Sequence, residues 1–153
     1  VLVVFIVTFI LVLSLVFYVK WSNTLIEKAK FDYERDRFEL LIGKIPQMAE
    51  FQCSSYNQEK HCIDASKLIA FKEVSNDYFS VFGYKNITIV EVYPFSNEKE
   101  CGKGNHLDCG MYSLYYKKKL SFKNKLIISS PVSLYYPDRD EYRIGKLIVE
   151  WYS

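Results

Sequence analysis

An almost continuous run of apolar residues occupies positions 1–19, and only Thr8, Ser14 and the hydroxyl of Tyr18 interrupt it. At about 1.5 Å per residue, a helix of this length spans roughly 28 Å, which matches the hydrocarbon core of a bilayer. A secretory signal peptide has a shorter apolar stretch and a cleavage site of small residues, and 17–21 offers no such site. The pattern therefore predicts a helix that enters a membrane at some stage.

The helical pattern continues into a charged segment that contains no glycine or proline before Gly43. Glycine at position 43 and Pro46 are expected to weaken or bend the helix. A single helix from residue 1 to about residue 42 would reach ~63 Å, and half of it would protrude from a globular head. We therefore predict two regions, an assembly helix over 1–45 and a head over 46–153. Apolar residues at near-helical spacing predict one face against a core: Trp21, Leu25, Ala29, Tyr33, Leu40 and Leu41.

The head begins with the features of a short helix. Asp64 suits the N-cap position, and apolar residues at helical spacing follow it as far as Phe71. The helix is expected to extend to about Phe71, or on to Phe82, and Gly83 is its stop.

From Asn86 onward the apolar period changes from that of a helix to two, which is typical of strands. Four strands are predicted, over 87–93, 111–116, 126–136 and 142–152. Pro131 indicates an edge position or a bulge in the third, and the turn over 137–141 makes the last two antiparallel. The predicted fold class is α+β, a long N-terminal hydrophobic helix plus a small antiparallel β-sheet head domain of about four strands.

The four cysteines form two local pairs in polar loops, Cys53 with Cys62 and Cys101 with Cys109. Four cysteines allow three connectivities, and the adjacent pairing is the simplest because each bond closes a short loop. Disulfides persist in oxidising compartments, so the head is expected to face the outside. A metal site with His61 and His106 is the alternative, but the chain lacks the Cys-x-x-Cys spacing that structural zinc sites usually have.

Motifs for catalysis or cofactor binding are absent from the sequence, which has no phosphate-binding loop, no nucleophile elbow and no zinc-protease motif. We therefore predict that the protein is not an enzyme and holds no cofactor or metal. A net charge of +2 does not favour nucleic acid as a partner. The lysine run 117–119 is interpreted as a solvated loop or strand end. Asn86-Ile87-Thr88 is a candidate N-glycosylation site at Asn86, and a strand-initiating Asn without a glycan is the alternative.

Three features together resemble the type IV pilin-like class, particularly its archaeal members. They are the apolar start Val1 to Ile10, its extension past Trp21 into an amphipathic helix, and a β-rich head with cysteine loops. Bacterial pilins usually carry a glutamate at the fifth mature position, and Phe5 stands there in this chain. The resemblance therefore favours the archaeal type. It implies a basic leader that a prepilin-type peptidase removes before Val1, in keeping with a run that begins without a methionine.

The resemblance implies a structural subunit of an extracellular, type IV pilus-like helical filament at the cell surface, used for adhesion or motility. The partners that it implies are further copies of the chain, the membrane before assembly and the pilus assembly machinery, with an N-glycan as a candidate. The alternative is a single-pass membrane-anchored extracytoplasmic binding or sensor domain. The residues expected to mediate assembly are Val1, Leu2, Val4, Phe5, Ile6, Phe9, Ile10, Leu13, Phe17 and Trp21.

Overall fold

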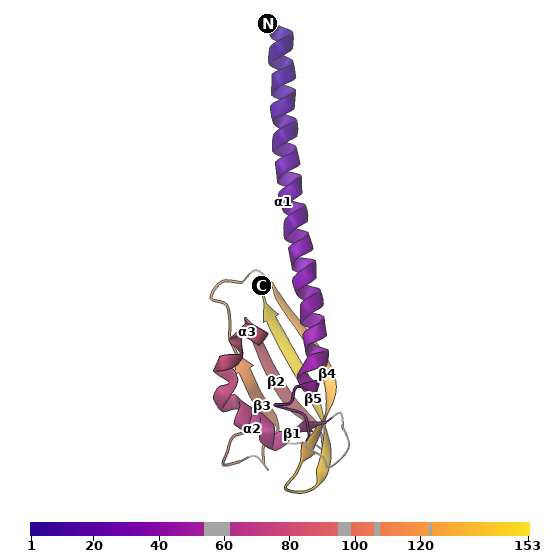
Figure 1. Ribbon diagram of the computed structural model, residues 1–153, viewed down its shortest axis with the longest axis vertical. Helices are drawn as coiled ribbons and strands as arrows, with labels where there is room; N and C mark the ends of the chain where they lie inside the picture. Colours follow the sequence, from indigo (N-terminus) through magenta and orange to yellow (C-terminus); the bar gives the residue numbers. More distant parts are fainter. Residues whose placement is uncertain (54–61, 95–98, 106–107, 123) are drawn as a thin grey trace. The chain divides into compact units, whose positions relative to one another are not determined.

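The N-terminal segment forms one continuous helix, α1 (Leu2–Lys44), in the computed structural model (Figure 1). No proline removes a backbone donor before Pro46, which lies in a single 3-10 turn, η1 (Ile45–Gln47). The predicted helix over residues 1 to about 42 is therefore confirmed. The structure describes residues 1–53, 62–94, 99–105, 108–122 and 124–153.

Two compact units make up the chain, Val1–Phe38 and Glu39–Ser153. The apolar face predicted for the charged part of α1 is wrong in detail, because Trp21, Leu25, Tyr33 and Leu40 are exposed. Phe38 is the buried residue of this helix, with 2% of its surface exposed. Residues at positions i and i+2 of a helix point in directions about 200° apart, so Phe38 and Leu40 lie on opposite sides of α1. Burial of Phe38 therefore leaves Leu40 exposed.

A curled, mixed sheet forms the centre of the second unit. Its described strands are β1 (Ile63–Asp64), β2 (Lys85–Tyr93), β3 (Met111–Tyr116), β4 (Lys125–Tyr136) and β5 (Glu141–Tyr152), in the order β1-β4-β5-β2-β3. β2 to β5 are the four predicted strands, and they pair antiparallel. β1 was not predicted; it pairs parallel to β4 through Leu134 and Tyr135, which makes the sheet mixed. The α+β class is confirmed.

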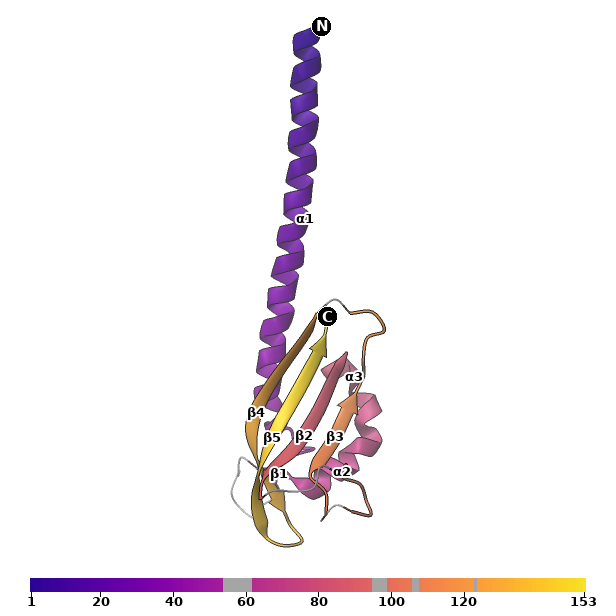
Figure 2. The same cartoon turned by 180° about the vertical axis from the view of Figure 1, so that it is seen from behind.

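Three short helical segments lie between β1 and β2: α2 (Ala65–Val74), η2 (Ser75–Tyr78) and α3 (Phe79–Phe82). The Asp64 carboxylate accepts hydrogen bonds from the backbone N–H groups of Ser66 at 2.9 Å and Lys67 at 3.4 Å, so it is the predicted N-cap. Gly83 ends α3 with a positive φ of 63°, which glycine adopts at little cost. Figures 1 and 2 show α2 and α3 together on one face of the sheet.

Alternate residues of the central strands fill the space beneath these helices. Ile89 of β2 lies opposite Leu147 of β5, and both are fully buried. On the helical side, Phe71 and Phe82 meet edge to face, and Phe82 lies 5.2 Å from the ring of Tyr115 on β3. Aromatic pairs of this geometry add to the free energy gained from burial alone. Aromatic residues make up 17% of the chain, and part of this content belongs to this core.

Close packing between β4 and β5 requires a glycine at one position. Gly145 lies opposite Val132, and a Cβ atom added there would be 2.8 Å from Cδ1 of Leu134.

On the side of β4 that faces away from β5, β1 pairs with it only at Leu134 and Tyr135 among the described residues. Pro131 therefore occupies an unpaired edge of the sheet, as its missing donor requires.

Replacing Gly145 with alanine is expected to destabilise the head by about 1–3 kcal/mol, because the new methyl group overlaps Leu134. Thermal unfolding of the full chain in detergent, followed by circular dichroism, measures this as a lower Tm. Gly43→Ala is the matched control, since a Cβ there has no neighbour within 4 Å and alanine favours the helix. Equal Tm values for the two variants would contradict the packing argument.

Candidate functional site

The apolar part of α1 is exposed on every side of the helix. Its large side chains, from Val1 to Val19, have exposed fractions between 47% and 112%. A helix that is apolar all round is one that lipid or other protein must cover. All the residues predicted to mediate assembly lie exposed on this surface, namely Val1, Leu2, Val4, Phe5, Ile6, Phe9, Ile10, Leu13, Phe17 and Trp21.

Two threonine hydroxyl groups within α1 are satisfied by the helix itself. The Thr8 hydroxyl donates to the carbonyl oxygens of Val4 at 3.0 Å and Phe5 at 2.9 Å. Thr24 donates in the same way to Lys20 at 3.0 Å. A polar group whose hydrogen bond is already made costs much less in apolar surroundings. These threonines are therefore compatible with a helix surrounded by lipid or by other helices.

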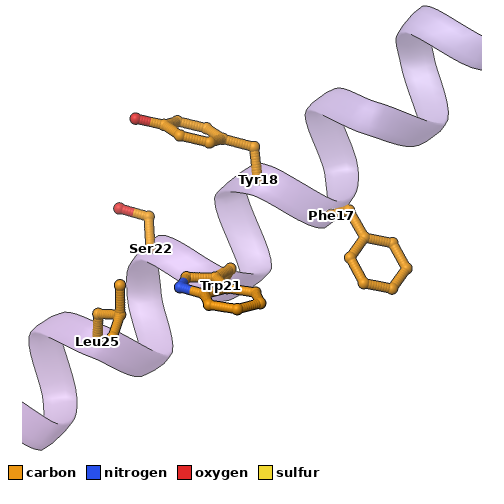
Figure 3. Close-up of a pocket in the computed structure, with 5 residues that line it drawn as sticks. All are labelled: Phe17, Tyr18, Trp21, Ser22 and Leu25. Carbon is orange, nitrogen blue, oxygen red and sulfur yellow. The ribbon is translucent and has the colours of Figure 1, made fainter.

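A shallow hollow of about 380 Å³ lies where the apolar run meets the charged part of α1. Phe17, Trp21 and Leu25, each four residues apart, form one row along it, and Tyr18 and Ser22 form a second (Figure 3). Rows at this spacing are the ridges between which a neighbouring helix inserts its side chains. The hollow thus has the geometry of a helix-packing site.

Among the described helices, the segment Leu2–Gln47 is long and apolar enough to cross a membrane, with a mean hydropathy of 3.1 over its most apolar window. The head that follows contains two disulfides, Cys53–Cys62 and Cys101–Cys109, and no free cysteine is described. Disulfides persist in oxidising surroundings. Together these features indicate membrane insertion or secretion and an extracellular location for the head.

Both disulfides follow the adjacent pairing. The loop that ends at Cys109 is also held to α2, where Lys72 and Glu73 form ion pairs with Glu100 and Lys103. The histidines of the alternative metal site, His61 and His106, lie outside the described residues. Within the described residues there is no group of three or more side chains suited to hold a metal ion.

A polar cluster lies buried on the inner face of the sheet. The side chain of Glu91 has no exposed surface, and its two oxygens accept from Arg143 at 2.9 Å and from the Tyr136 hydroxyl at 2.8 Å. Tyr136 in turn accepts from Tyr112 at 3.0 Å. The Arg143 guanidinium also lies 4.5 Å from the centre of the Tyr136 ring and reaches Glu141. The cluster therefore links four strands, β2 to β5.

The electrostatics of this cluster keep its tyrosines neutral. Burial, together with the hydrogen bonds to Tyr112 and Glu91, raises the pKa of Tyr136 far above its ordinary value. Burial likewise raises the pKa of Tyr112. Neutral Tyr136 donates to the Glu91 carboxylate and neutral Tyr112 donates to Tyr136, which supports a structural role rather than proton transfer.

Sequence reasoning did not single out Glu91 or Arg143. The alternation along β2 contained the necessary information, because Ile87, Ile89 and Glu91 share one face of the strand. The same period places Arg143 on the inner face of β5. What the sequence could not supply was the pairing of β2 with β5, which brings the two charges together.

The candidate glycosylation residue, Asn86, belongs to a second polar group near the start of β2. Its amide donates to Glu150 at 3.2 Å, and Glu150 also accepts from the Tyr152 hydroxyl at 2.6 Å and Lys125 at 2.8 Å. Burial opposes the charge on Glu150, but these three donors together hold its pKa below the ordinary value. Burial and the contact with Glu150 raise the pKa of Tyr152 to about 12. Glycosylation at Asn86 stays a prediction.

No protein-family model, curated protein or solved structure matches this chain.

Replacing Arg143 with methionine is expected to lower the free energy of unfolding by about 3–5 kcal/mol, because the buried Glu91 carboxylate loses its counter-ion. The double variant Glu91→Gln/Arg143→Met should lose less than the sum of the two single variants, since neither charge is then left alone. Chemical denaturation of the full chain in detergent measures each loss. Strict additivity would show that the two residues do not interact.

A pH titration tests the group around Glu150. A carboxyl group whose pKa is lowered by folding stabilises the fold above its unfolded pKa, about 4.3, and this contribution is lost as the pH falls. Glu150→Gln should lower the free energy of unfolding by about 1–3 kcal/mol at pH 7 and flatten the fall in Tm between pH 5 and pH 3. Lys125→Met should also make the fall in Tm between pH 5 and pH 3 less steep, because it removes the ion pair with Glu150. Unchanged acid slopes in both variants would contradict the assignment.

Proposed function

We propose that this protein is a structural subunit of an extracellular helical filament of the type IV pilin-like class, archaeal type, with α1 as the assembly stem. The observation that carries this proposal is a helix exposed and apolar on every side from Val1 to Val19. This stem belongs to the same chain as a disulfide-containing α+β head. Such a chain needs lipid or other copies of its stem around it at all times.

The filament follows from what happens when the stem leaves the bilayer. In lipid its apolar side chains are already out of water, so contact between stems adds mainly van der Waals fit. Outside lipid, the stems avoid water by packing against one another, and each large side chain then gains about 1.5–3 kcal/mol. Repetition of one head-to-tail contact between identical subunits produces a helical polymer.

Shape rather than charge is proposed to align the stems. Phe5 supplies no carboxylate for a charge pair near the start of the stem. The hollow beside Phe17, Trp21 and Leu25 instead offers a place for a side chain of a neighbouring stem. The charged residues that follow, such as Lys20 and Glu27, are at the surface, where single ion pairs contribute little.

The proposed partners follow the life of such a subunit. A prepilin-type peptidase and the pilus assembly machinery act while the stem is in the membrane, and further copies of the chain surround it afterwards. The head would then form the outer surface, used for adhesion or motility. No nucleic acid, metal or cofactor is part of the proposal.

Electron microscopy of material sheared from producing cells tests this function, with the filaments labelled by an antibody against the head. Unchanged chain should form labelled filaments. Phe17→Ala/Trp21→Ala should reduce their number roughly tenfold or more, because two packed aromatic side chains are truncated. Phe17→Leu/Trp21→Phe keeps most of the volume and is the matched control.

Two outcomes contradict the proposal, and membrane fractionation distinguishes them. If the unchanged chain stays in the membrane as a single copy and no labelled filament forms, the anchored binding or sensor domain is the better function. If the alanine variant assembles as well as the control, filaments form but the stem contact around Trp21 is wrong.

A further inference from the structure

One end of the sheet gathers four chain segments that are far apart in the sequence. The backbone N–H of Lys117, after β3, donates to the carbonyl of Lys85 at 2.9 Å, and that of Tyr152 donates to Tyr84 at 3.3 Å. Ser153 pairs with Asn124 before β4. α3 belongs to the same end, because the Tyr115 hydroxyl donates to the Gly83 carbonyl at 2.8 Å. We call the surface residues of this end the strand-end rim: Phe79, Val81, Tyr84, Tyr116 and 117–122.

Apolar and aromatic side chains of the rim are unusually exposed. Leu120 is entirely exposed, and Tyr116 is 60% exposed. Phe79 and Tyr84 contact each other edge to face, with ring centres 5.4 Å apart, yet both remain exposed. A protruding leucine beside several aromatic rings forms a surface with affinity for an apolar phase.

The charge of the rim has one sign. No aspartate or glutamate occurs over residues 109–137, whereas five lysines do. Within the rim Lys118 and Lys119 are exposed, and the ammonium of Lys118 lies 5.2 Å from the centre of the Phe122 ring. Glu150, on β5, already forms an ion pair with Lys125 at the start of β4. The rim lysines are therefore available to a negatively charged partner.

We propose that the strand-end rim binds the anionic lipid headgroups of the bilayer, with the lysines on the phosphates and Leu120 and Phe122 in the interface. Aromatic residues and lysines beside exposed leucine are the combination found where proteins meet a membrane surface. The inference rests on the membrane stage of the proposed function and not on filament formation. The head would thus be held against the bilayer before assembly, and extraction of the stem would also break this contact.

The test places an environment-sensitive fluorophore, NBD, on Ser121→Cys in the full chain, whose other cysteines are in disulfides. The labelled protein is reconstituted into vesicles of phosphatidylcholine alone or with 30% phosphatidylglycerol. We expect a blue-shifted, brighter emission in the anionic vesicles, and its loss in 0.5 M NaCl. Ser66→Cys is the matched control site, because Asp64, its N-cap partner, pairs with Tyr135 at the opposite end of β4.

Three further variants identify the chemistry of the contact. Lys118→Gln/Lys119→Gln should reduce the ratio of bound to free rim roughly 25-fold, about fivefold per lysine, whereas Lys118→Arg/Lys119→Arg should bind as the parent does. Leu120→Ser should weaken binding in the same assay. Circular dichroism of each variant shows that the head is folded.

Three results would overturn the inference. They are equal emission in neutral and anionic vesicles, an equal shift at Ser66, and a shift that grows with protein density at constant lipid composition. The last would assign the rim to contact between copies of the chain. Filament formation is scored separately by microscopy, so the proposed function can fail while this inference holds, and the reverse.

Discussion

The free-energy cost of exposing α1 to water is the constraint on which the rest of this protein depends. Each large apolar side chain in water costs about 1.5–3 kcal/mol, and a whole domain is stable by only about 5–15 kcal/mol. The run from Val1 to Val19 is exposed along its full length, so a few of its residues equal the stability of a domain. This run therefore needs lipid or other protein to cover it, and for that reason we propose α1 as the functional element.

The head consequently needs a stability of its own. Its inner face is completed by buried residues from β2 and β5, such as Ile89 and Leu147. Where that face becomes polar, the buried Glu91 carboxylate accepts from Arg143 and from the neutral Tyr136, which in turn accepts from Tyr112, so this carboxylate has the partners that a buried polar group needs. Disulfides that close short loops add a constraint on the unfolded chain. Both the polar cluster and the disulfides act within the head.

Apolar period and turn residues were enough to predict the long helix and the strands β2 to β5, because each of these elements is long enough to show a period. β1 was not predicted because a strand of two residues is too short to show an alternation of apolar and polar positions. Without β1, the sheet was expected to be purely antiparallel. The Glu91–Arg143 pair was not predicted because it depends on which strands are neighbours in the sheet, and the pattern within a single strand does not indicate the strand order. The exposed stem was predictable from composition alone, but composition cannot rank its positions, since every side of the helix is apolar.

A helix that is equally apolar on all sides has little means of choosing the rotation at which it packs. Charge does not supply the choice in its polar half, because Arg35 already lies between Asp32 and Asp36 of the same helix, and exposed pairs contribute little in any case. The remaining source of specificity is shape, and around Phe17 and Trp21 aromatic side chains border a hollow. In the proposed filament, alignment between copies would therefore be set there and by the heads, while the run before Phe17 would supply affinity without direction.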